Sequence, residues 1–124
     1  LVREDGMGLL LISHDLGVMA DTVQRMLVMY GGTVVESGPT AAIFARLAHP
    51  YSRGLFAARP RLGLARGTRL ATIPGRVPEL IDLPPGCPFA DRCQLVIDEC
   101  RRAPPPPQIV SAGHEVRCIR WDQA

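Results

Sequence analysis

The distribution of proline and cysteine constrains this chain more than any other feature of its sequence. Nine of the 12 prolines fall between Pro74 and Pro107, and all four cysteines lie at or after Cys87. Proline has no backbone N–H and a fixed φ, so it is excluded from helix interiors and central strands. The second half of the chain is therefore expected to be dominated by loops.

Composition divides the chain into two parts joined by a linker. Residues 1–58 are apolar and periodic, residues 59–72 read as a basic linker, and residues 73–124 are rich in proline, cysteine and turns. The apolar fraction of 47% excludes a disordered tail. The longest apolar run, residues 7–12, is far shorter than the ~20 residues of a membrane span. Because the chain opens with Leu1 and not methionine, we expect a fragment of a longer protein.

The charge pattern limits the chemistry that this chain can carry out. All 14 basic residues are arginine, so the chain lacks the lysine of a Walker A loop and cannot form a Schiff base through lysine. The formal net charge is only +2, which does not indicate a surface that binds polyanions. We therefore expect no nucleic-acid partner.

The first part opens with a pattern typical of an α/β unit. Residues 8–13 form a short apolar run without alternation, which predicts a strand buried on both faces, as in a parallel sheet. A helix is predicted to follow, because apolar residues recur at helical spacing from Leu16 to Val23. Asp15 is placed to cap the first turn of that helix.

A hairpin is predicted next. The β-rich runs 25–30 and 33–36 flank Gly31 and Gly32, and both glycines can take the positive φ of a two-residue turn. The hairpin therefore depends on two adjacent residues without side chains.

Two helices are predicted to complete the first part. Thr40 is placed to cap a helix that turns Ile43 inward. Pro50 can start a second helix, since the first helical position needs no N–H. His49, directly before Pro50, is expected to hydrogen bond at the helix end.

His14 is the main candidate for a ligand-binding or catalytic residue in the first part. It follows the predicted strand 8–13, at the strand end where open α/β sheets hold their ligands. A neutral imidazole there can hydrogen bond to a phosphate oxygen or an attacking water, although from spacing alone a histidine at an ordinary turn is the simpler interpretation. Ser13 and Asp15 do not complete a hydrolase triad with it, because adjacent residues at a strand end point to different sides.

The residues around His14 resemble the end of an ABC-transporter ATPase domain. They read Leu-Leu-Leu-Ile-Ser-His-Asp-Leu-Gly-Val over residues 9–18 and Met-Tyr-Gly-Gly-Thr-Val-Val-Glu-Ser-Gly over residues 29–38. The resemblance implies that His14 is the switch histidine, which contacts the γ-phosphate of Mg-ATP and helps to position water in the closed ATPase dimer. The sequence has no Walker A loop, signature motif or Walker B glutamate. The chain is therefore expected to be the C-terminal end of such a P-loop ATPase domain and to be inactive alone.

Four cysteines are the candidate metal ligands of the second part. Successive members are separated by 5, 6 and 17 residues; they are Cys87, Cys93, Cys100 and Cys118. This spacing lacks the close pair of most zinc sites and suits a [4Fe–4S] cluster, which commonly takes four thiolates. His114, four residues before the last cysteine, leaves a Cys₃His zinc site open. A disulfide framework and buried free thiols are also compatible with the cysteine pattern.

The stretch between Cys93 and Cys100 sets a geometric condition. On one helix the two residues would be about 10.5 Å apart along the axis, too far for one compact cluster. We therefore expect the helix to end or bend before Cys100, and the prolines at 104–107 agree with an early stop. The arginines beside the candidate ligands would either offset cluster charge or form a solvated surface; they are Arg92, Arg101, Arg102 and Arg117.

Motifs in the second part of the chain make the resemblance to ABC ATPases more specific. Ile73-Pro-Gly-Arg-Val-Pro, Leu83-Pro-Pro-Gly-Cys-Pro-Phe-Ala-Asp-Arg-Cys and His114-Glu-Val-Arg-Cys are similar to the C-terminal extension of dipeptide/oligopeptide (and nickel) importer ATP-binding subunits. Residues 44–60 are similar to the helical stretch before that extension. The resemblance implies a [4Fe–4S] cluster on the four cysteines. A structural role is expected for the cluster, because a Pro-rich segment buries little core of its own.

The resemblance also implies partners and a location. The full-length protein would couple ATP hydrolysis to peptide uptake together with two transmembrane permease subunits, a second homologous ATP-binding subunit and, indirectly, an extracytoplasmic peptide-binding protein. It would lie peripherally at the cytoplasmic face of the cell membrane. Cargo is read by the binding protein and the channel, so these residues do not select among dipeptide, oligopeptide, nickel and glutathione. The alternative class is a non-enzymatic metal-binding interaction module.

Overall fold

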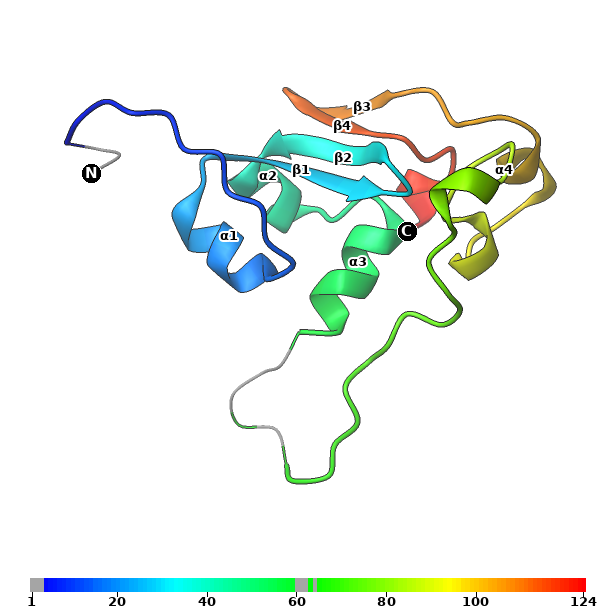
Figure 1. The fold of residues 1–124 in the computed structure, drawn as a ribbon, viewed down its shortest axis with the longest axis horizontal. Helices are drawn as coiled ribbons and strands as arrows, with labels where there is room; N and C mark the ends of the chain where they lie inside the picture. Colours follow the sequence, from blue (N-terminus) through cyan, green and yellow to red (C-terminus); the bar gives the residue numbers. More distant parts are fainter. Residues whose placement is uncertain (1–3, 60–62, 64) are drawn as a thin grey trace.

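The computed structural model describes residues 4–59, 63 and 65–124, so part of the predicted linker lies outside the described residues. Figure 1 shows four strands side by side, with α1 and α4 toward opposite ends of the sheet. None of the helices in the described part has the length and apolar character of a membrane span. The elements in chain order are α1 (Leu16–Thr22), β1 (Arg25–Tyr30), β2 (Thr33–Pro39), α2 (Thr40–Ala45), α3 (Pro50–Ala57), the 3₁₀ turns η1 (Leu80–Asp82) and η2 (Ala90–Arg92), α4 (Asp98–Arg102), β3 (Gln108–Ser111), β4 (His114–Val116) and η3 (Trp121–Gln123).

The predicted hairpin is confirmed. β1 and β2 pair antiparallel, and the turn between them has φ of 56° at Gly31 and 77° at Gly32. Along β1 the buried residues alternate with exposed ones, so that Met26, Val28 and Tyr30 face the core. The hairpin therefore forms as the period-two pattern and the glycine pair indicate.

The two compositional parts share one sheet. Its strand order is β1-β2-β4-β3, and all pairs are antiparallel. β4 lies beside β2, with Glu36 opposite Val116 and Ser37 opposite Glu115. The chain is thus a small α/β fold whose sheet is antiparallel, and the Pro-rich second part supplies two of its four strands.

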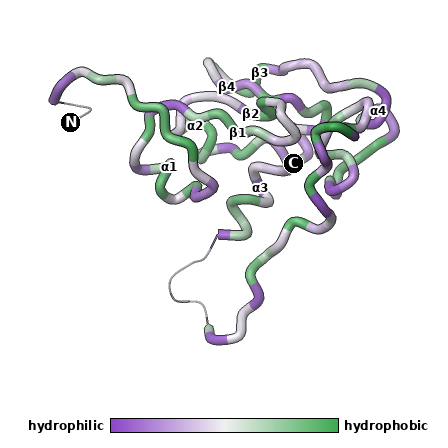
Figure 2. The backbone as a smooth tube through the Cα atoms, in the orientation of Figure 1, coloured by the Kyte–Doolittle hydropathy of each residue, from purple (hydrophilic) through white to green (hydrophobic). Residues whose placement is uncertain are grey.

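The prediction of a buried strand over residues 8–13 is wrong. This segment is extended but belongs to no sheet, and Leu10 and Ile12 are 87% and 90% exposed. Figure 2 shows it as a largely hydrophobic stretch that leads into α1. A strand buried on both faces needs neighbours on either side, and the described residues contain no strand that pairs with it.

The predicted helices are present, with one change in capping. Asp15 caps α1, since its side chain accepts hydrogen bonds from the backbone N–H groups of residues 17 and 18. α3 begins at Pro50 with His49 as its N-cap, as expected. Thr40 does not cap α2: it is the first helical residue, Pro39 precedes it, and the Thr40 hydroxyl is buried without a partner. The backbone N–H of Thr40 pairs instead with the carbonyl of Gln24, which ties α2 to the start of β1.

The core joins the hairpin to the cysteine region. Tyr30 packs edge-on against Tyr51 and Phe89, with ring centroids 4.7 and 5.1 Å away. Phe89 is 3% exposed and lies just before η2, so an aromatic contact connects β1 to the segment that carries the first two cysteines. Arg92 also holds this segment, because its guanidinium donates to the carbonyls of Ile73 and Pro74 at 3.1 and 2.8 Å.

Candidate functional site: a cysteine-lined cavity

All four cysteines line a single cavity, named here the cysteine cavity. Each is a free thiol, and they come from three places in the fold. Cys87 and Cys93 flank η2, Cys100 lies within α4, and Cys118 follows β4. Cys93 and Cys100 do not share a helix, but the helix does not end before Cys100 as expected: α4 begins at Asp98, after Cys93, and contains Cys100.

Gly86 allows two sides of the cysteine cavity to approach each other. The Cys87 N–H donates to the Cys100 carbonyl oxygen at 2.7 Å. A Cβ on Gly86 would overlap that same oxygen and would lie 2.6 Å from the carbonyl carbon of Arg101. Only glycine fits here without a shift of the backbone, so a residue without a side chain lets the backbones of Cys87 and Cys100 meet.

Backbone N–H groups point at the cysteine sulfurs. The Leu95 N–H donates to Cys93 Sγ and the Arg120 N–H donates to Cys118 Sγ, each at 3.4 Å. The backbone of Phe89 likewise lowers the pKa of Cys87. In each case the donor lies two residues after the cysteine. Such bonds favour a charged sulfur, and hydrogen bonds of this kind tune metal-bound thiolates.

Burial works against ionisation of three of these thiols. Burial raises the pKa of Cys118 to about 11, although the Arg120 backbone N–H lowers it in part. Burial likewise raises the pKa of Cys87 and of Cys93, again opposed by a backbone N–H. These three thiols are therefore neutral near pH 7 without metal, and a bound metal would have to displace their protons.

The thiols are not gathered closely enough for one metal ion. Across the described ranges, no three His, Cys, Asp or Glu side chains lie close enough together to hold a single ion. Tetrahedral zinc needs each sulfur about 2.3 Å from one metal, whereas a four-iron cluster spreads its thiolates over separate irons. The described residues therefore form no site for a lone zinc ion.

His49 and Arg120 also line the cysteine cavity, and sequence reasoning gave neither of them a role there. His49 is 1% exposed, its Nδ1 accepts from the Tyr51 N–H at 3.0 Å, and burial lowers its pKa to about 4. Arg120 Nη2 contacts the side-chain oxygen of Gln123. Neither His49 Nε2 nor Arg120 Nε has a partner, and both atoms are buried. No signal in the sequence distinguished Arg120, because Arg102 also lies two residues after a cysteine.

The structure does not bring His114 to the cysteines. His114 Nε2 lies 2.7 Å from Glu36 Oε1, and both side chains are fully buried between β4 and β2. The same carboxylate accepts from the backbone N–H groups of Ala48 and His49 at 2.9 and 3.0 Å. His114 is therefore part of a link between strands, and the Cys₃His alternative for zinc is not formed.

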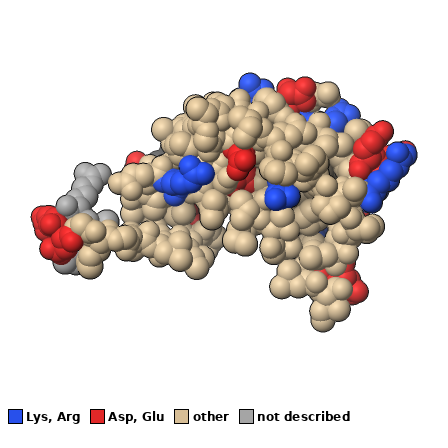
Figure 3. All heavy atoms as spheres, turned by 90° about the horizontal axis from the view of Figure 1, so that it is seen from above, with Lys and Arg blue, Asp and Glu red and all other residues tan. Residues whose placement is uncertain are grey.

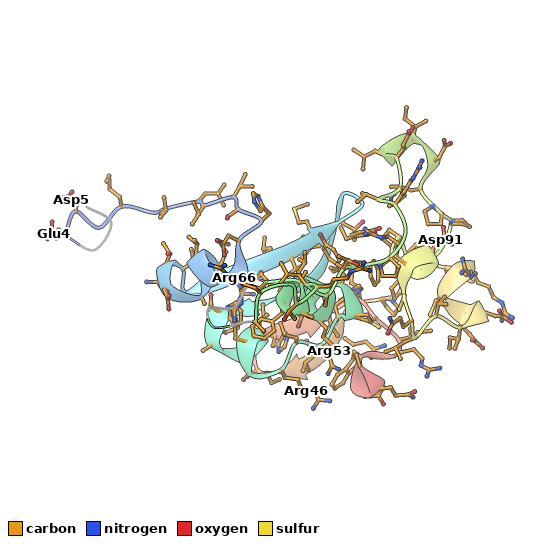
Figure 4. The ribbon with its side chains drawn as sticks, turned by 90° about the horizontal axis from the view of Figure 1, so that it is seen from below. Glu4, Asp5, Arg46, Arg53, Arg66 and Asp91 are labelled. Carbon is orange, nitrogen blue, oxygen red and sulfur yellow. The ribbon has the colours of Figure 1, made fainter. Side chains whose placement is uncertain are left out.

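The arginines expected to offset cluster charge are engaged elsewhere or lie outside the cavity lining. Arg92 binds backbone carbonyls, and Arg101 pairs with Asp91 at the surface. Figure 4 shows Asp91 at the far end of the molecule from Glu4 and Asp5, and Figure 3 shows charged side chains scattered over one face. Arg102 and Arg117 do not line the cavity; among the lining residues the only arginine is Arg120.

His14 lies apart from the cysteine cavity. It is exposed in the turn between the extended segment and α1, and it is not among the lining residues. The Ser13 hydroxyl accepts from the Asp15 N–H at 3.0 Å, which shapes this turn. The described residues thus contain two separate candidate features, a cavity at the second part and an exposed histidine at the first.

A family model ties these features to a known group of proteins. The model described as the C-terminal region of oligopeptide/dipeptide transporters matches residues 35–100. The match spans more than half of the chain, so the chain belongs to this family. It covers Cys87, Cys93 and Cys100, while Cys118 and His14 lie outside the matched range.

Curated relatives agree with the family. A putative peptide import ATP-binding protein of Brucella ovis is 48% identical over 128 residues, covering 99% of this chain and 38% of the relative. The oligopeptide transport ATP-binding protein OppD of Mycobacterium tuberculosis is 51% identical over 117 residues, covering 94% of this chain and 19% of the relative. The dipeptide transport ATP-binding protein DppD of Bacillus subtilis is 43% identical over 121 residues, covering 98% and 36%. The chain therefore spans well under half the length of these relatives, and none of their names mentions iron or zinc.

Proposed function

We propose that this chain is the C-terminal part of the ATP-binding subunit of an ABC importer, which couples ATP hydrolysis to the uptake of dipeptides or oligopeptides. The observation that carries the proposal is the similarity of nearly the whole chain to proteins named for peptide import and ATP binding, at 48% identity for the Brucella ovis protein. ATP and Mg²⁺ bind the full-length protein, and the chain alone is inactive. None of the three relatives supports a separate metal-binding module.

The partners follow from the class of protein. The full-length subunit works with two transmembrane permease subunits, a second ATP-binding subunit and an extracytoplasmic peptide-binding protein, and it lies at the cytoplasmic face of the membrane. The exposed apolar surface of the first part supports this assembly. Leu10 and Ile12, together with Leu27 and Met29 on the outer face of β1, are each more than half exposed. Exposed apolar surface of this kind marks sites of contact with further polypeptide where it forms a patch.

We propose that residues 1–58 are the end of the ATPase domain, that residues 59–72 are a linker and that residues 73–124 are a C-terminal extension.

A test of the whole proposal uses the full-length subunit reconstituted with its permease and binding protein in proteoliposomes. ATP hydrolysis should rise when labelled di- or tripeptide is supplied, and label should accumulate inside. An assembled complex that hydrolyses ATP but ignores every peptide would contradict the proposed cargo.

Within this subunit, His14 contacts the γ-phosphate of ATP in the closed dimer. Its exposure at the end of the segment 8–13 leaves the imidazole available to a nucleotide on another surface. His14→Ala in the full-length protein should lower turnover and leave nucleotide binding largely intact, because a contact made in the closed state matters most for the chemical step. Ser13→Ala is the matched control in the same turn. Equal turnover in the His14 variant and the parent would leave His14 as a turn residue.

The cysteine cavity holds a [4Fe–4S] cluster on Cys87, Cys93, Cys100 and Cys118. Four free thiols on one cavity and backbone N–H groups directed at two of the sulfurs support this cofactor. When bound, the cluster supplies four iron–sulfur links that staple the extension, and it gives this region a redox centre. The residues of the chain orient the thiols.

Iron analysis separates the cluster from zinc. The chain purified without oxygen should be brown and should hold about four irons and four sulfides. Single Cys→Ser changes should each weaken the cluster, because a hydroxyl is a poor substitute for a soft thiolate. His114→Gln should leave the iron content unchanged. Colourless protein with one zinc per chain would overturn the cluster and leave the importer assignment standing.

A further inference from the structure

Two residues that line the cysteine cavity each carry a buried N–H donor without an acceptor. Four buried side-chain polar atoms in the described part have no hydrogen-bond partner, and two of them are hydroxyls outside the cavity lining. The other two are His49 Nε2 and Arg120 Nε, whose residues both line the cavity. Leaving a buried donor unpaired costs about 1–3 kcal/mol, so two of them beside one cavity indicate an acceptor that belongs there.

The hydrogen bonds of His49 fix where its proton lies. Nδ1 accepts from the Tyr51 N–H at the N-cap of α3, so Nδ1 carries no proton. In a neutral imidazole the proton is then on Nε2, which makes Nε2 a donor. The ring cannot exchange these roles without losing the cap. His49 therefore presents a fixed N–H donor in the wall of the cavity.

Arg120 presents the second donor in a similar way. Its backbone N–H bonds to Cys118 Sγ, and its Nη2 is held by Gln123, so the guanidinium is fixed at both ends while Nε–H stays unpaired. Arginine remains charged at every relevant pH. The lining of the cavity thus includes the four cysteines together with one residue that carries a neutral donor and one that carries a positively charged donor.

The lining of the cavity limits which kind of atom can accept these two hydrogen bonds. Most lining residues are apolar or are the cysteines themselves. The carboxylate of Glu99 lines the cavity but is exposed and accepts from neither donor. Neutral thiols are weak acceptors, whereas thiolate and sulfide in an iron–sulfur cluster carry negative charge.

We propose that His49 Nε2–H and Arg120 Nε–H donate hydrogen bonds to the sulfur atoms of the cluster in the cysteine cavity, an inference that rests on the cluster proposed above. Reduction adds an electron to the cluster, and donors to sulfur stabilise the more negative state. The two residues therefore raise the reduction potential, which makes them tuning residues for a redox centre and not only packing residues.

The first test observes the hydrogen bond directly. The chain of 124 residues is labelled with ¹⁵N-histidine, reconstituted with iron and sulfide without oxygen, and reduced with dithionite. Pulsed EPR should detect a ¹⁵N coupling to the reduced cluster, and His49→Asn should abolish it. His49→Asn keeps a side-chain acceptor for the Tyr51 N–H, because Asn is a good N-cap residue. The other two histidines remain labelled in that variant, so it also assigns the signal.

The second test measures the reduction potential by titration. At a fixed poise, His49→Asn and Arg120→Met should each lower the ratio of reduced to oxidised cluster by roughly tenfold, which is a shift of about 59 mV to more negative potential for one electron. Arg46→Met is the matched control, since it removes one arginine charge at the margin of the molecule, over the Trp121 ring and outside the cavity lining (Figure 4).

The outcomes separate the two proposals. An unsubstituted chain that forms no iron–sulfur cluster overturns the cluster and the donor assignment together. A cluster that forms, shows no ¹⁵N coupling and keeps its potential in both variants overturns the donor assignment alone. An equal shift in Arg46→Met would reduce the effect of Arg120 to general charge and would also contradict its assignment.

Discussion

Replacing Glu36 with alanine should destabilise the fold by about 3–5 kcal/mol, because it breaks a fully buried pair and leaves its partners unsatisfied. The carboxylate accepts from the Ala48 and His49 N–H groups and pairs with His114 Nε2. Glu36 is 1% exposed, so water cannot replace these bonds. Each unpaired buried donor costs about 1–3 kcal/mol, which agrees with the size expected for the pair.

Glu36→Gln separates the hydrogen bonds from the volume of the side chain. Glutamine has nearly the same shape, but its amide NH₂ must face one of the three donors. We expect a loss of about 1–3 kcal/mol for this variant. Glu115→Ala is the matched control: it removes an exposed carboxylate from the neighbouring strand and should change stability by less than about 0.5 kcal/mol.

Urea unfolding of the metal-free chain, followed by circular dichroism, measures these differences. The midpoint should fall in the order Glu115→Ala, Glu36→Gln, Glu36→Ala, with an unchanged slope. Total stability of a domain is only about 5–15 kcal/mol, so Glu36→Ala would be close to marginal. If Glu36→Ala and Glu115→Ala unfolded at the same urea concentration, the buried carboxylate would contribute nothing to the stability of the fold, contrary to the prediction.

Three further predictions concern pH, backbone fit and nucleotide. The pKa of His49 is lowered to about 4, against 6.5 for an ordinary histidine, so the unfolded chain binds a proton that the folded chain rejects between these values. The metal-free chain should therefore lose up to about 3 kcal/mol as pH falls from 6.5 to 4, and His49→Asn should flatten that part of a stability-versus-pH curve. Gly86→Ala should reduce iron content several-fold by iron assay, because the new Cβ overlaps the Cys100 carbonyl, whereas Gly8→Ala meets no atom within 4 Å and should have no effect. Isothermal titration of the chain with Mg-ATP should show no binding heat, since no phosphate-cradling loop is present; micromolar affinity would contradict the assignment to the end of an ATPase domain.

Local patterns predicted the local structure of this chain. The Gly31-Gly32 turn, the Asp15 cap and the start of α3 at Pro50 each depend on a few adjacent residues, and each was found. The strand over residues 8–13 was not found, because a buried strand is defined by neighbours that a local run does not contain. The β2–β4 pairing could not be predicted for the same reason.

The candidate site shows the same division between local and distant information. The four cysteines were identified from their spacing, and they do line one cavity. The role of His49 at the helix end was also expected, but its second nitrogen meets the cavity only through the tertiary fold. Arg120 could not be distinguished from the other arginines by sequence, since what sets it apart is a buried Nε without a partner.

The pairing of β2 with β4 has a consequence for biosynthesis. β4 is nearly the last element of the chain, and residues 40–113 separate it from its partner strand. On the ribosome, the outer edge of β2 must therefore stay unpaired until residues 114–116 emerge. Glu36 lacks its hydrogen-bond partner His114 for the same time. An open strand edge invites pairing with other chains, and closing so long a loop is slow. A stop codon anywhere before residue 114 would thus leave a permanently unpaired edge, so truncated chains should aggregate even where most of the hairpin and helices are complete.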